Sequence, residues 1–198
     1  MKNKKSNLGT IFITGISASG KTTLGKRLLN DLIESGFKNL KLLDGEETRT
    51  LFETRGLHFG YSVEDRDAHT REIAKLVFEY NAKGIICIVC AIAPSKKSRE
   101  QMRQQVGSLM EVYLECPVEV CAKRDYKGHY SKAFKGLYKT FIGVTDPYEI
   151  SDHPQLVLKT HKMDVKLCSE TLLKKSLDYL KNGKNEYMMF NAEGKLDT

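Results

Sequence analysis

A glycine-rich segment between a predicted strand and a predicted helix constrains this chain more than any other feature. Gly15–Thr22 reads GISASGKT and matches G-x-x-x-x-G-K-[ST] at every position. The β-branched run TIFIT over 10–14 precedes it, and leucines at helical spacing follow it. The glycines let backbone N–H groups converge on phosphate oxygens, and the start of the helix adds its positive end. The segment therefore predicts a phosphate-binding loop, or P-loop.

Strand-like and helix-like segments alternate along the rest of the chain. This order is typical of an α/β fold, here a three-layer P-loop kinase fold with a mostly parallel central sheet and helices on both faces. Ligands bind such folds at the carboxyl ends of the strands. The predicted strands are 10–14, 40–43, 85–92, 112–114 and 156–158; the predicted helices cover 24–36, about 65–83, a segment with Met102, Val106 and Leu109, and 169–180.

One folded unit accounts for the length, because 198 residues are close to the roughly 150 of an average domain. We predict a basic N-terminal tail over 1–9, a P-loop kinase domain over 10–180 and a polar C-terminal tail over 181–198. Residues 124–149 are rich in Gly, Tyr and Lys and lack clean periodicity, which predicts a lid-like segment. A small cluster at 187–190 is a candidate for docking on the body or on a second subunit.

Charge and residue usage narrow the class of partner. The chain carries a net charge of +7 with a pI near 9.1, but its Lys and Arg are interspersed with acidic residues, and tryptophan is absent. That distribution favours small polyanionic substrates over nucleic acid. The longest apolar run, 85–94, is too short to cross a bilayer, and five cysteines do not suit a disulfide framework. We expect a cytoplasmic protein that binds neither nucleic acid nor membrane.

The remaining motifs separate a kinase from a guanine-nucleotide switch. A switch reads its base with N-K-x-D, and this string does not occur in the sequence. The one D-x-x-G, at 125–128, follows the P-loop too late for the usual switch position. A small-molecule kinase with a basic lid fits better.

The P-loop also assigns roles on the ATP side. Lys21 supplies a positive charge between the β- and γ-phosphates, and the Thr22 hydroxyl is suited to Mg²⁺. Asp44 ends the second predicted strand, beside the P-loop if the two strands are neighbours, where a carboxylate can meet Mg²⁺ or an incoming hydroxyl. Asp44 can also be the N-cap of a helix, and the two roles are compatible. We predict that Lys21 and Asp44 are catalytic, that Thr22 and Asp44 are metal ligands, and that ATP is bound by Gly15, Ile16, Ser17, Ala18, Ser19, Gly20, Lys21, Thr22 and Thr23.

From Gly15 to about Thr160 the sequence resembles the adenylylsulfate kinase family, whose members phosphorylate the 3′-hydroxyl of adenosine 5′-phosphosulfate. The resemblance implies ATP and Mg²⁺ as cofactors, a small nucleotide acceptor, a homodimer, and a place for Arg124 at the ATP site. It also makes Asp44 a base or metal-side carboxylate, with Glu46 as a second acidic group. The motifs that carry it are, in order, GISASGKT at 15–22, LDGEETR at 43–49, GYS at 60–62 with Asp65-Arg66, RDYKGHY at 124–130, Lys132-Ala133, FIG at 141–143 and DPYE at 146–149.

Acceptor binding is inferred from the same motifs. Arg49 and Arg66 are candidates for holding the acceptor's 5′-anion, because guanidinium groups match phosphate or sulfate oxygens bidentately. The resemblance implies that Tyr61 and Phe141 sandwich the acceptor base, and stacking of this kind accepts any base. The full predicted acceptor set is Asp44, Glu46, Arg49, Tyr61, Arg66, His69, Ile92, Ala93, Pro94, Lys132, Phe141 and Gly143.

Departures from the family pattern cluster on the acceptor side. His69 stands where the family has asparagine, with Ala68 before it, and Ala93-Pro94-Ser95 replaces S-P-Y. Glu47-Thr48 replaces Asn-Val, and the segment between Arg49 and Tyr61 is longer. A related acceptor such as cytidine diphosphoramidate therefore remains an alternative to adenylylsulfate. A non-catalytic nucleotide-binding regulator is disfavoured by the intact Lys21, Thr22 and Asp44.

Two further residue patterns carry alternatives. His69 can hydrogen-bond the base or sugar of the acceptor, or it can be a helix-surface histidine without contact. Cys87 and Cys90 have C-x-x-C spacing, but residues three apart on a strand point to opposite faces. We therefore expect two buried thiols rather than a zinc site or a redox pair.

Overall fold

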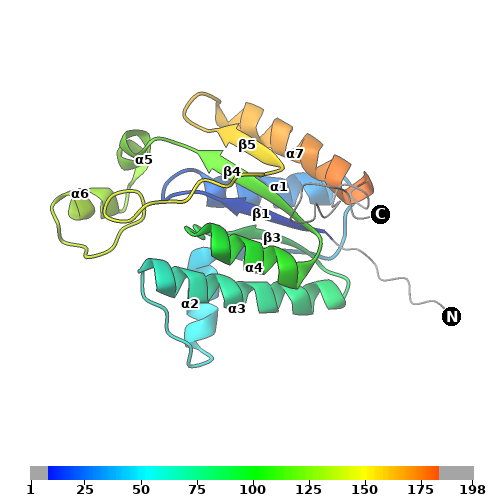
Figure 1. The fold of residues 1–198 in the computed structure, drawn as a ribbon. Helices are drawn as coiled ribbons and strands as arrows, with labels where there is room; N and C mark the ends of the chain where they lie inside the picture. The colour runs from blue at the N-terminus through cyan, green and yellow to red at the C-terminus, as the bar shows by residue number, and fades with distance from the viewer. Residues whose placement is uncertain (1–8, 183–198) are drawn as a thin grey trace, which may run out of the picture.

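Five parallel strands form one sheet in the computed structural model, which describes residues 9–182 (Figure 1). Their order across the sheet is β2-β3-β1-β4-β5, so the strand that leads into the P-loop is central. The predicted α/β fold is confirmed, with a sheet that is parallel throughout. The strands are β1 (Thr10–Thr14), β2 (Leu40–Asp44), β3 (Ile86–Cys90), β4 (Leu109–Glu115) and β5 (Leu156–Lys159).

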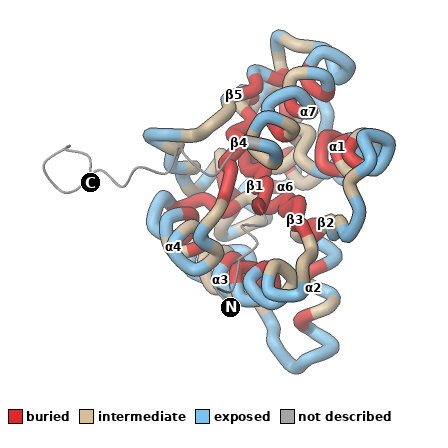
Figure 2. The backbone as a smooth tube through the Cα atoms, turned by 90° about the vertical axis from the view of Figure 1, so that its right-hand side faces the viewer, coloured by how far each residue is buried: buried red, intermediate tan, exposed pale blue. Residues whose placement is uncertain are grey.

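Helices cover both faces of the sheet, as predicted. On one face α1 (Lys21–Glu34) and α7 (Val165–Asn182) enclose a cluster that includes Leu24, Leu28 and Leu172. On the other face α3 (Val63–Ala82) and α4 (Lys96–Val106) enclose a second cluster with Ile73 and Met102. Figure 2 shows the buried strands between these two layers.

Alternating side chains decide which layer each strand residue joins. Ile11 and Ile13 pack under α1 and α7, whereas Phe12 between them packs under α3 and α4. Cys90 lies in the first cluster and Cys87 in the second, and both thiols are buried and free. The expected separation of this pair is confirmed.

Gly25 lets α1 approach the sheet closely. A Cβ atom at this position would collide with Sγ of Cys90 on β3 and would lie 3.2 Å from Cδ1 of Leu42 on β2. Because the position is a glycine, the first turns of α1 lie directly over β3. This brings the N-terminus of α1 towards the carboxyl end of β2.

Three helices and the bounds of two strands, β3 and β4, differ most from the sequence predictions. The helices α2 (Gly45–Glu53), α5 (Val118–Arg124) and α6 (His129–Phe134) are short and were not predicted. Leu109, expected on a helix, begins β4 and pairs with Thr10. The reason is Gly107, whose φ of 83° ends α4 before that residue. The strand expected over 85–92 spans only 86–90, and the chain continues as the loop that leads to α4.

The predicted tails over 1–9 and 181–198, with the cluster at 187–190, lie almost wholly outside the described residues. Within 9–182, no helix is long and apolar enough to span a membrane.

Candidate active site

The P-loop connects β1 to α1 in a conformation that needs glycine. Gly15 has φ 144° and Gly20 has φ 106°, both in the region that other residues rarely adopt. The ammonium group of Lys21 folds over the loop and donates to the Ile16 carbonyl at 2.7 Å. Burial lowers the pKa of Lys21 to about 8, and the nearby Asp44 carboxylate opposes this shift. Anionic phosphate in the loop would give this buried ammonium a partner.

Two buried side chains hold the P-loop backbone from behind. The Tyr130 hydroxyl of α6 donates to the Ser17 carbonyl at 2.9 Å, and the Thr160 hydroxyl donates to the Ser19 carbonyl at 3.0 Å. Arg124 donates to the Thr160 carbonyl at 2.7 Å. Arg124 therefore supports the P-loop indirectly. It binds Thr160, the residue after β5, and Thr160 binds the loop.

Asp44 joins the P-loop helix to α2. Its Oδ1 accepts the Glu46 N–H at 3.0 Å and so caps α2, while its Oδ2 accepts the Thr22 hydroxyl at 2.6 Å. The two alternatives for Asp44 are therefore compatible in the structure. The strands β1 and β2 are not neighbours, because β3 lies between them. The contact arises because the first turn of α1 reaches across β3.

Thr22 and Asp44 offer a pair of adjacent oxygen ligands of the kind that Mg²⁺ prefers. Within residues 9–182, His, Cys, Asp and Glu side chains form no cluster of three or more that could hold a metal by themselves. The pair fits an ion that binds through few protein oxygens and completes its shell with water and phosphate.

Arg49 of α2 and Arg66 of α3 converge on one exposed aromatic ring. Their guanidinium carbons lie 4.7 Å and 5.4 Å from the centre of the Tyr61 ring. Arg49 also donates to the carbonyls of Phe59 and Gly60 at 2.8 and 2.9 Å, and Arg66 to that of Tyr61 at 3.1 Å. We call these three side chains the arginine–tyrosine clamp.

The two guanidinium groups of the clamp bring two positive charges close together. Among the described residues neither guanidinium forms an ion pair, and Tyr61 is 61% exposed. Burial, followed by the charge of Arg49, lowers the pKa of Arg66 to about 10. Such a pair is suited to a dianionic group of a ligand.

Phe141 lies in the predicted lid segment, 124–149, within ring contact of two tyrosines. Its ring centre is 4.9 Å from that of Tyr130, edge to face, and 5.9 Å from that of Tyr138, stacked. The ring contacts found in residues 9–182 do not include one between Phe141 and Tyr61. The predicted base sandwich between these two rings therefore stays a prediction.

His69 is buried beneath the clamp. It is 4% exposed, and its Nε2 lies 3.1 Å from Oγ1 of Thr48 on α2. The alternative of a helix-surface histidine is wrong, because α2, which the sequence did not reveal, covers this position. The imidazole reaches a neighbouring helix rather than open solvent.

The loop after β3 is held from two sides. Arg99, buried in an ion pair with Glu111 at 3.3 Å, donates to the Ala93 carbonyl at 2.7 Å. Ser95 caps α4 and donates to Asp67 of α3 at 2.7 Å. The predicted acceptor residues Ile92, Ala93 and Pro94 thus lie in a segment with a fixed backbone, and Ala93 has φ 40°.

Two predicted residues are at the surface. Glu46 is 77% exposed and forms an ion pair with Lys127 of the predicted lid segment at 2.7 Å. Lys132 of α6 is also exposed. Gly143 lies in the turn of the segment after α6, where its N–H donates to the Asp146 carbonyl at 2.7 Å.

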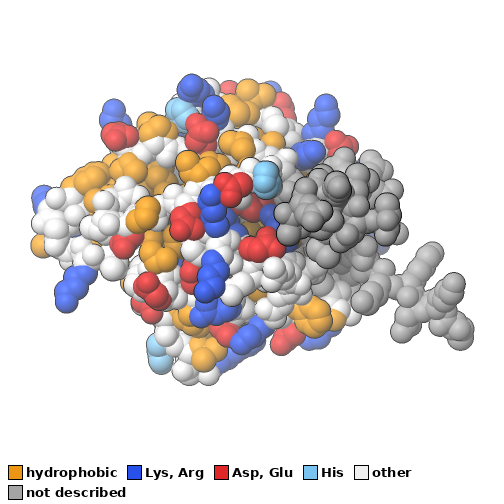
Figure 3. All heavy atoms as spheres, viewed as in Figure 1, with side chains coloured by type: hydrophobic (Ala, Val, Ile, Leu, Met, Phe, Trp, Pro, Cys, Tyr) orange, Lys and Arg blue, Asp and Glu red, His pale blue; other side chains and the backbone are white. Residues whose placement is uncertain are grey.

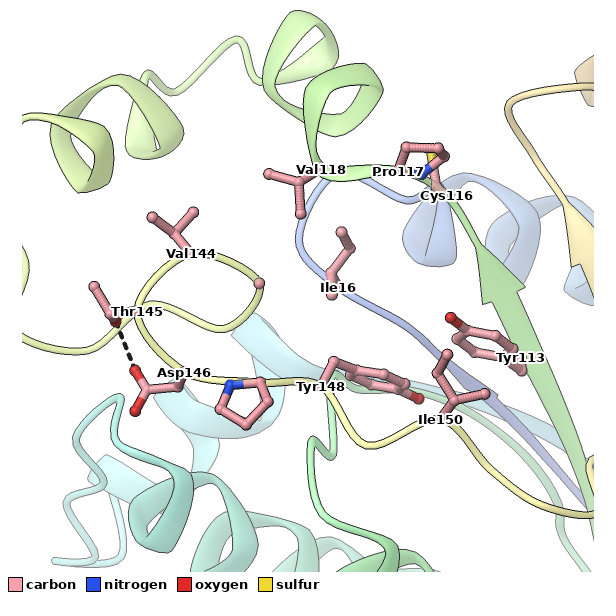
Figure 4. A pocket seen from close by; sticks show the side chains of 12 residues that line it. Ile16, Tyr113, Cys116, Pro117, Val118, Val144, Thr145, Asp146, Tyr148 and Ile150 are labelled. Carbon is pink, nitrogen blue, oxygen red and sulfur yellow. Dashed lines mark hydrogen bonds between the residues drawn. The ribbon is translucent and has the colours of Figure 1, made fainter.

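A hollow of about 490 Å³ opens between the P-loop, the end of β4 and the segment 143–150 (Figure 4). Tyr148 stacks on Tyr113 with ring centres 5.5 Å apart, and its hydroxyl lies 2.9 Å from Oγ1 of Thr14. The hollow is lined by Ile16, Tyr113, Cys116, Pro117, Val118, Gly143, Val144, Thr145, Asp146, Pro147, Tyr148 and Ile150.

Figure 3 shows Lys and Arg interspersed with Asp and Glu on one face, with hydrophobic side chains gathered where Figure 1 draws α5 and α6.

Sequence reasoning gave no role to several residues that shape the site. Tyr130 and Tyr148 lie inside recognised motifs, which was the one available signal. Thr48 was noted as a departure without a partner, and Thr160 and Arg99 carried no signal at all.

Known proteins resemble this chain over most of its length. The family model for adenylylsulphate kinase matches residues 8–159. An adenylyl-sulfate kinase from Picosynechococcus sp. is 38% identical over 166 residues, which cover 84% of this chain and 92% of the relative. A structure of the Mycobacterium tuberculosis APS kinase in complex with AMPPNP and APS aligns with a TM-score of 0.78 and 26% identity, covering 85% of this chain and 97% of that one. A hexameric APS kinase from Thiobacillus denitrificans aligns with a TM-score of 0.63 and 25% identity, over 88% of this chain and 30% of that one.

The P-loop and the parallel sheet agree with these relatives. The chain belongs to the adenylylsulphate kinase family, whose members are ATP-dependent phosphotransferases.

Proposed function

We propose that this chain transfers the γ-phosphoryl group of ATP to the ribose 3′-hydroxyl of adenylylsulfate, giving 3′-phosphoadenylylsulfate and ADP. The observation that carries this proposal is the arginine–tyrosine clamp beside the Asp44–Thr22 contact. One helix, α2, has Asp44 at its N-terminus and Arg49 further along. An acceptor whose anion meets the clamp then has its sugar near Asp44.

The P-loop residues 15–23 are proposed to bind the phosphates of ATP, with Lys21 as the positive group at the transferring phosphoryl. Lys21 is already beside the loop at Ile16 O, so a small movement brings it to the phosphates. Phosphoryl transfer depends mainly on alignment and charge stabilisation, and a buried ammonium supplies the second.

Thr22 and Asp44 would hold Mg²⁺, which when bound neutralises charge on the phosphates. Asp44 has a second proposed role as the group that accepts the proton of the attacking hydroxyl. Its Oδ2 accepts one hydrogen bond from Thr22. A carboxylate held in this way is oriented before either substrate binds.

The acceptor is proposed to bind between the clamp and the segment 141–146. Arg49 and Arg66 would hold its 5′-linked anion, and Tyr61 would stack on its base. Glu46, Lys132, Gly143 and the loop 92–94 complete the proposed acceptor set. Assembly as a homodimer also stays a proposal, and sedimentation velocity of the purified chain tests it.

The test is a coupled ADP-release assay with purified protein, ATP and Mg²⁺. The wild type should turn over adenylylsulfate with kcat/KM well above that for adenosine monophosphate, which lacks the sulfate. Faster turnover of cytidine diphosphoramidate would move the acceptor to the alternative. Absence of ADP release with every acceptor, while the protein binds ATP, would contradict the proposal.

A further inference from the structure

A buried hydrogen-bond chain connects α3 to the backbone at Asp44. Oγ1 of Thr48 lies 3.1 Å from Nε2 of His69 and 2.9 Å from the Asp44 carbonyl oxygen. Thr48 is 2% exposed and His69 is 4% exposed, so water does not compete for these contacts. A buried contact of this kind is costly to break, because the group left behind loses its partner.

The direction of the chain follows from the single proton of the Thr48 hydroxyl. A carbonyl oxygen can only accept, so Thr48 donates to Asp44 and has only its lone pairs left for His69. With the Thr48 proton donated within α2, where the Asp44 and Gly45 carbonyl oxygens lie 2.9 and 3.3 Å from Oγ1, the contact requires an imidazole that carries a proton on Nε2 and donates it to Oγ1. Burial, then the charges of Arg49 and Arg66, lower the pKa of His69 to about 3, so the ring is neutral.

Aromatic neighbours fix the plane of the imidazole. The ring centre of Phe59 lies 5.3 Å away and that of Phe52 lies 5.7 Å away at an interplanar angle of 84°. These contacts hold the plane of the imidazole in which Nε2 lies 3.1 Å from Oγ1 of Thr48.

The connected residues lie next to the groups that the proposed reaction needs. Thr48 precedes Arg49 on α2, and His69 lies one turn after Arg66 on α3. The Asp44 carbonyl belongs to the residue whose side chain accepts from Thr22. Because Asp44 is the N-cap of α2 and Arg49 lies on α2, a shift of α2 against α3 would change the distance of each of them from the Arg66 guanidinium group on α3.

We propose that Thr48 and His69 are positioning residues, which lock α2 against α3 and set the placement of Asp44 and Arg49 relative to Arg66. This inference rests on the proposed function for its activity readout. His69 then acts through Thr48 and α2, and its direct contact with the acceptor is not required.

Four variants test the proposal: Thr48→Val, Thr48→Ser, His69→Phe and the double variant Thr48→Val/His69→Phe. Valine removes the hydroxyl and leaves Nε2–H without a partner, and serine keeps the hydroxyl. We expect Thr48→Val to lower kcat/KM for adenylylsulfate about tenfold, which corresponds to about 1.4 kcal/mol, with an unchanged KM for ATP. Thr48→Ser should stay within about threefold of the wild type.

The double variant tests coupling. Replacing both partners by apolar groups leaves less unsatisfied than removing one. We therefore expect the double variant to lose less than the product of the two single losses, in both kcat/KM and the free energy of unfolding. Additive losses would overturn the proposal, as would a Thr48→Val enzyme equal to the wild type. A loss in His69→Phe far above that in Thr48→Val, retained in full in the double variant, would overturn the proposal in favour of direct contact between His69 and the acceptor.

The folded protein also supplies a readout that needs no activity. Nitrogen NMR of the imidazole at pH 7 should show His69 neutral with its proton on Nε2, and Thr48→Val should move this signal. A proton on Nδ1 would contradict the donation from His69 to Thr48 and overturn the proposal. If the wild type proves inactive on all acceptors, the proposed function fails, while the coupling and the NMR signal still decide the role of the pair.

Discussion

Around the P-loop, buried side chains hold backbone carbonyl groups, whereas in the arginine–tyrosine clamp partly exposed guanidinium groups hold the carbonyls of 59–61 and lie against an exposed ring. Tyr130 and Thr160 donate to carbonyls of the P-loop. Arg49 and Arg66 instead lie against the ring of Tyr61, which is 61% exposed. The difference teaches that the P-loop is held in shape by buried contacts without a ligand, whereas solvent reaches the contacts of the clamp, where we propose that the acceptor binds.

The largest effect should come from removing the positive charge of Lys21 at the P-loop. We expect Lys21→Ala to lower kcat by about a thousandfold or more, the scale of a lost charge-stabilising group. Circular dichroism should be unchanged, because the ammonium contributes little to core packing. Lys26→Ala, an exposed position on the same helix, is the control. Activity of Lys21→Ala within threefold of the wild type would contradict the role of the P-loop.

Asp44 connects the P-loop helix, through Thr22, to α2, which carries Arg49 of the clamp. We expect Asp44→Asn to lower kcat roughly a hundredfold, the scale of a lost acid–base group, with a smaller change in KM for ATP. Asparagine caps helices nearly as well as aspartate, so the melting temperature should barely change. Asp164, whose Oδ1 accepts the Leu167 N–H at the start of α7, gives the matched control Asp164→Asn. Near-normal kcat in Asp44→Asn would reduce Asp44 to a cap.

In the acceptor half, Arg66→Gln should raise KM for adenylylsulfate about tenfold or more and leave KM for ATP unchanged. A hydrogen bond to a charged group contributes about 1.5–3 kcal/mol. Steady-state kinetics with each substrate varied separately measures this split. Arg71→Gln, an exposed change on the same helix, should have no effect. An equal rise in both KM values would place Arg66 outside the acceptor site.

The smallest effect should come from one anchor of the P-loop. Tyr130→Phe removes the hydroxyl that donates to Ser17, a neutral bond that contributes about 0.5–1.5 kcal/mol. We expect a several-fold rise in KM for ATP with an unchanged KM for the acceptor. Tyr126→Phe, at a 91% exposed ring, is the control. A change confined to acceptor KM would show that the lid, rather than the P-loop, depends on Tyr130.

The P-loop and the region of the clamp also differ in how far the sequence predicts them. The P-loop was predicted residue by residue, since its glycines and its lysine act within one short segment. The five strands were likewise found, because their apolar runs are local. His69 could not be placed, because its partner Thr48 lies 21 positions away on a helix that the sequence did not reveal. Arg124 was assigned to ATP from its motif, yet its contacts reach the carbonyl of Thr160, which no motif includes.

Gly25 connects the packing of the core to the contact between Thr22 and Asp44. Thr22 meets Asp44 because the first turns of α1 lie against β3, and they do so because no Cβ separates residue 25 from Cys90. An alanine there would push the helix axis outward, and Thr22, one turn away, would move with it. A position that lies in the core, away from the P-loop, therefore sets the geometry of the Thr22–Asp44 contact. A larger side chain at Gly25 would alter the distance between the two oxygen atoms of Thr22 and Asp44 for which we propose a role in Mg²⁺ binding.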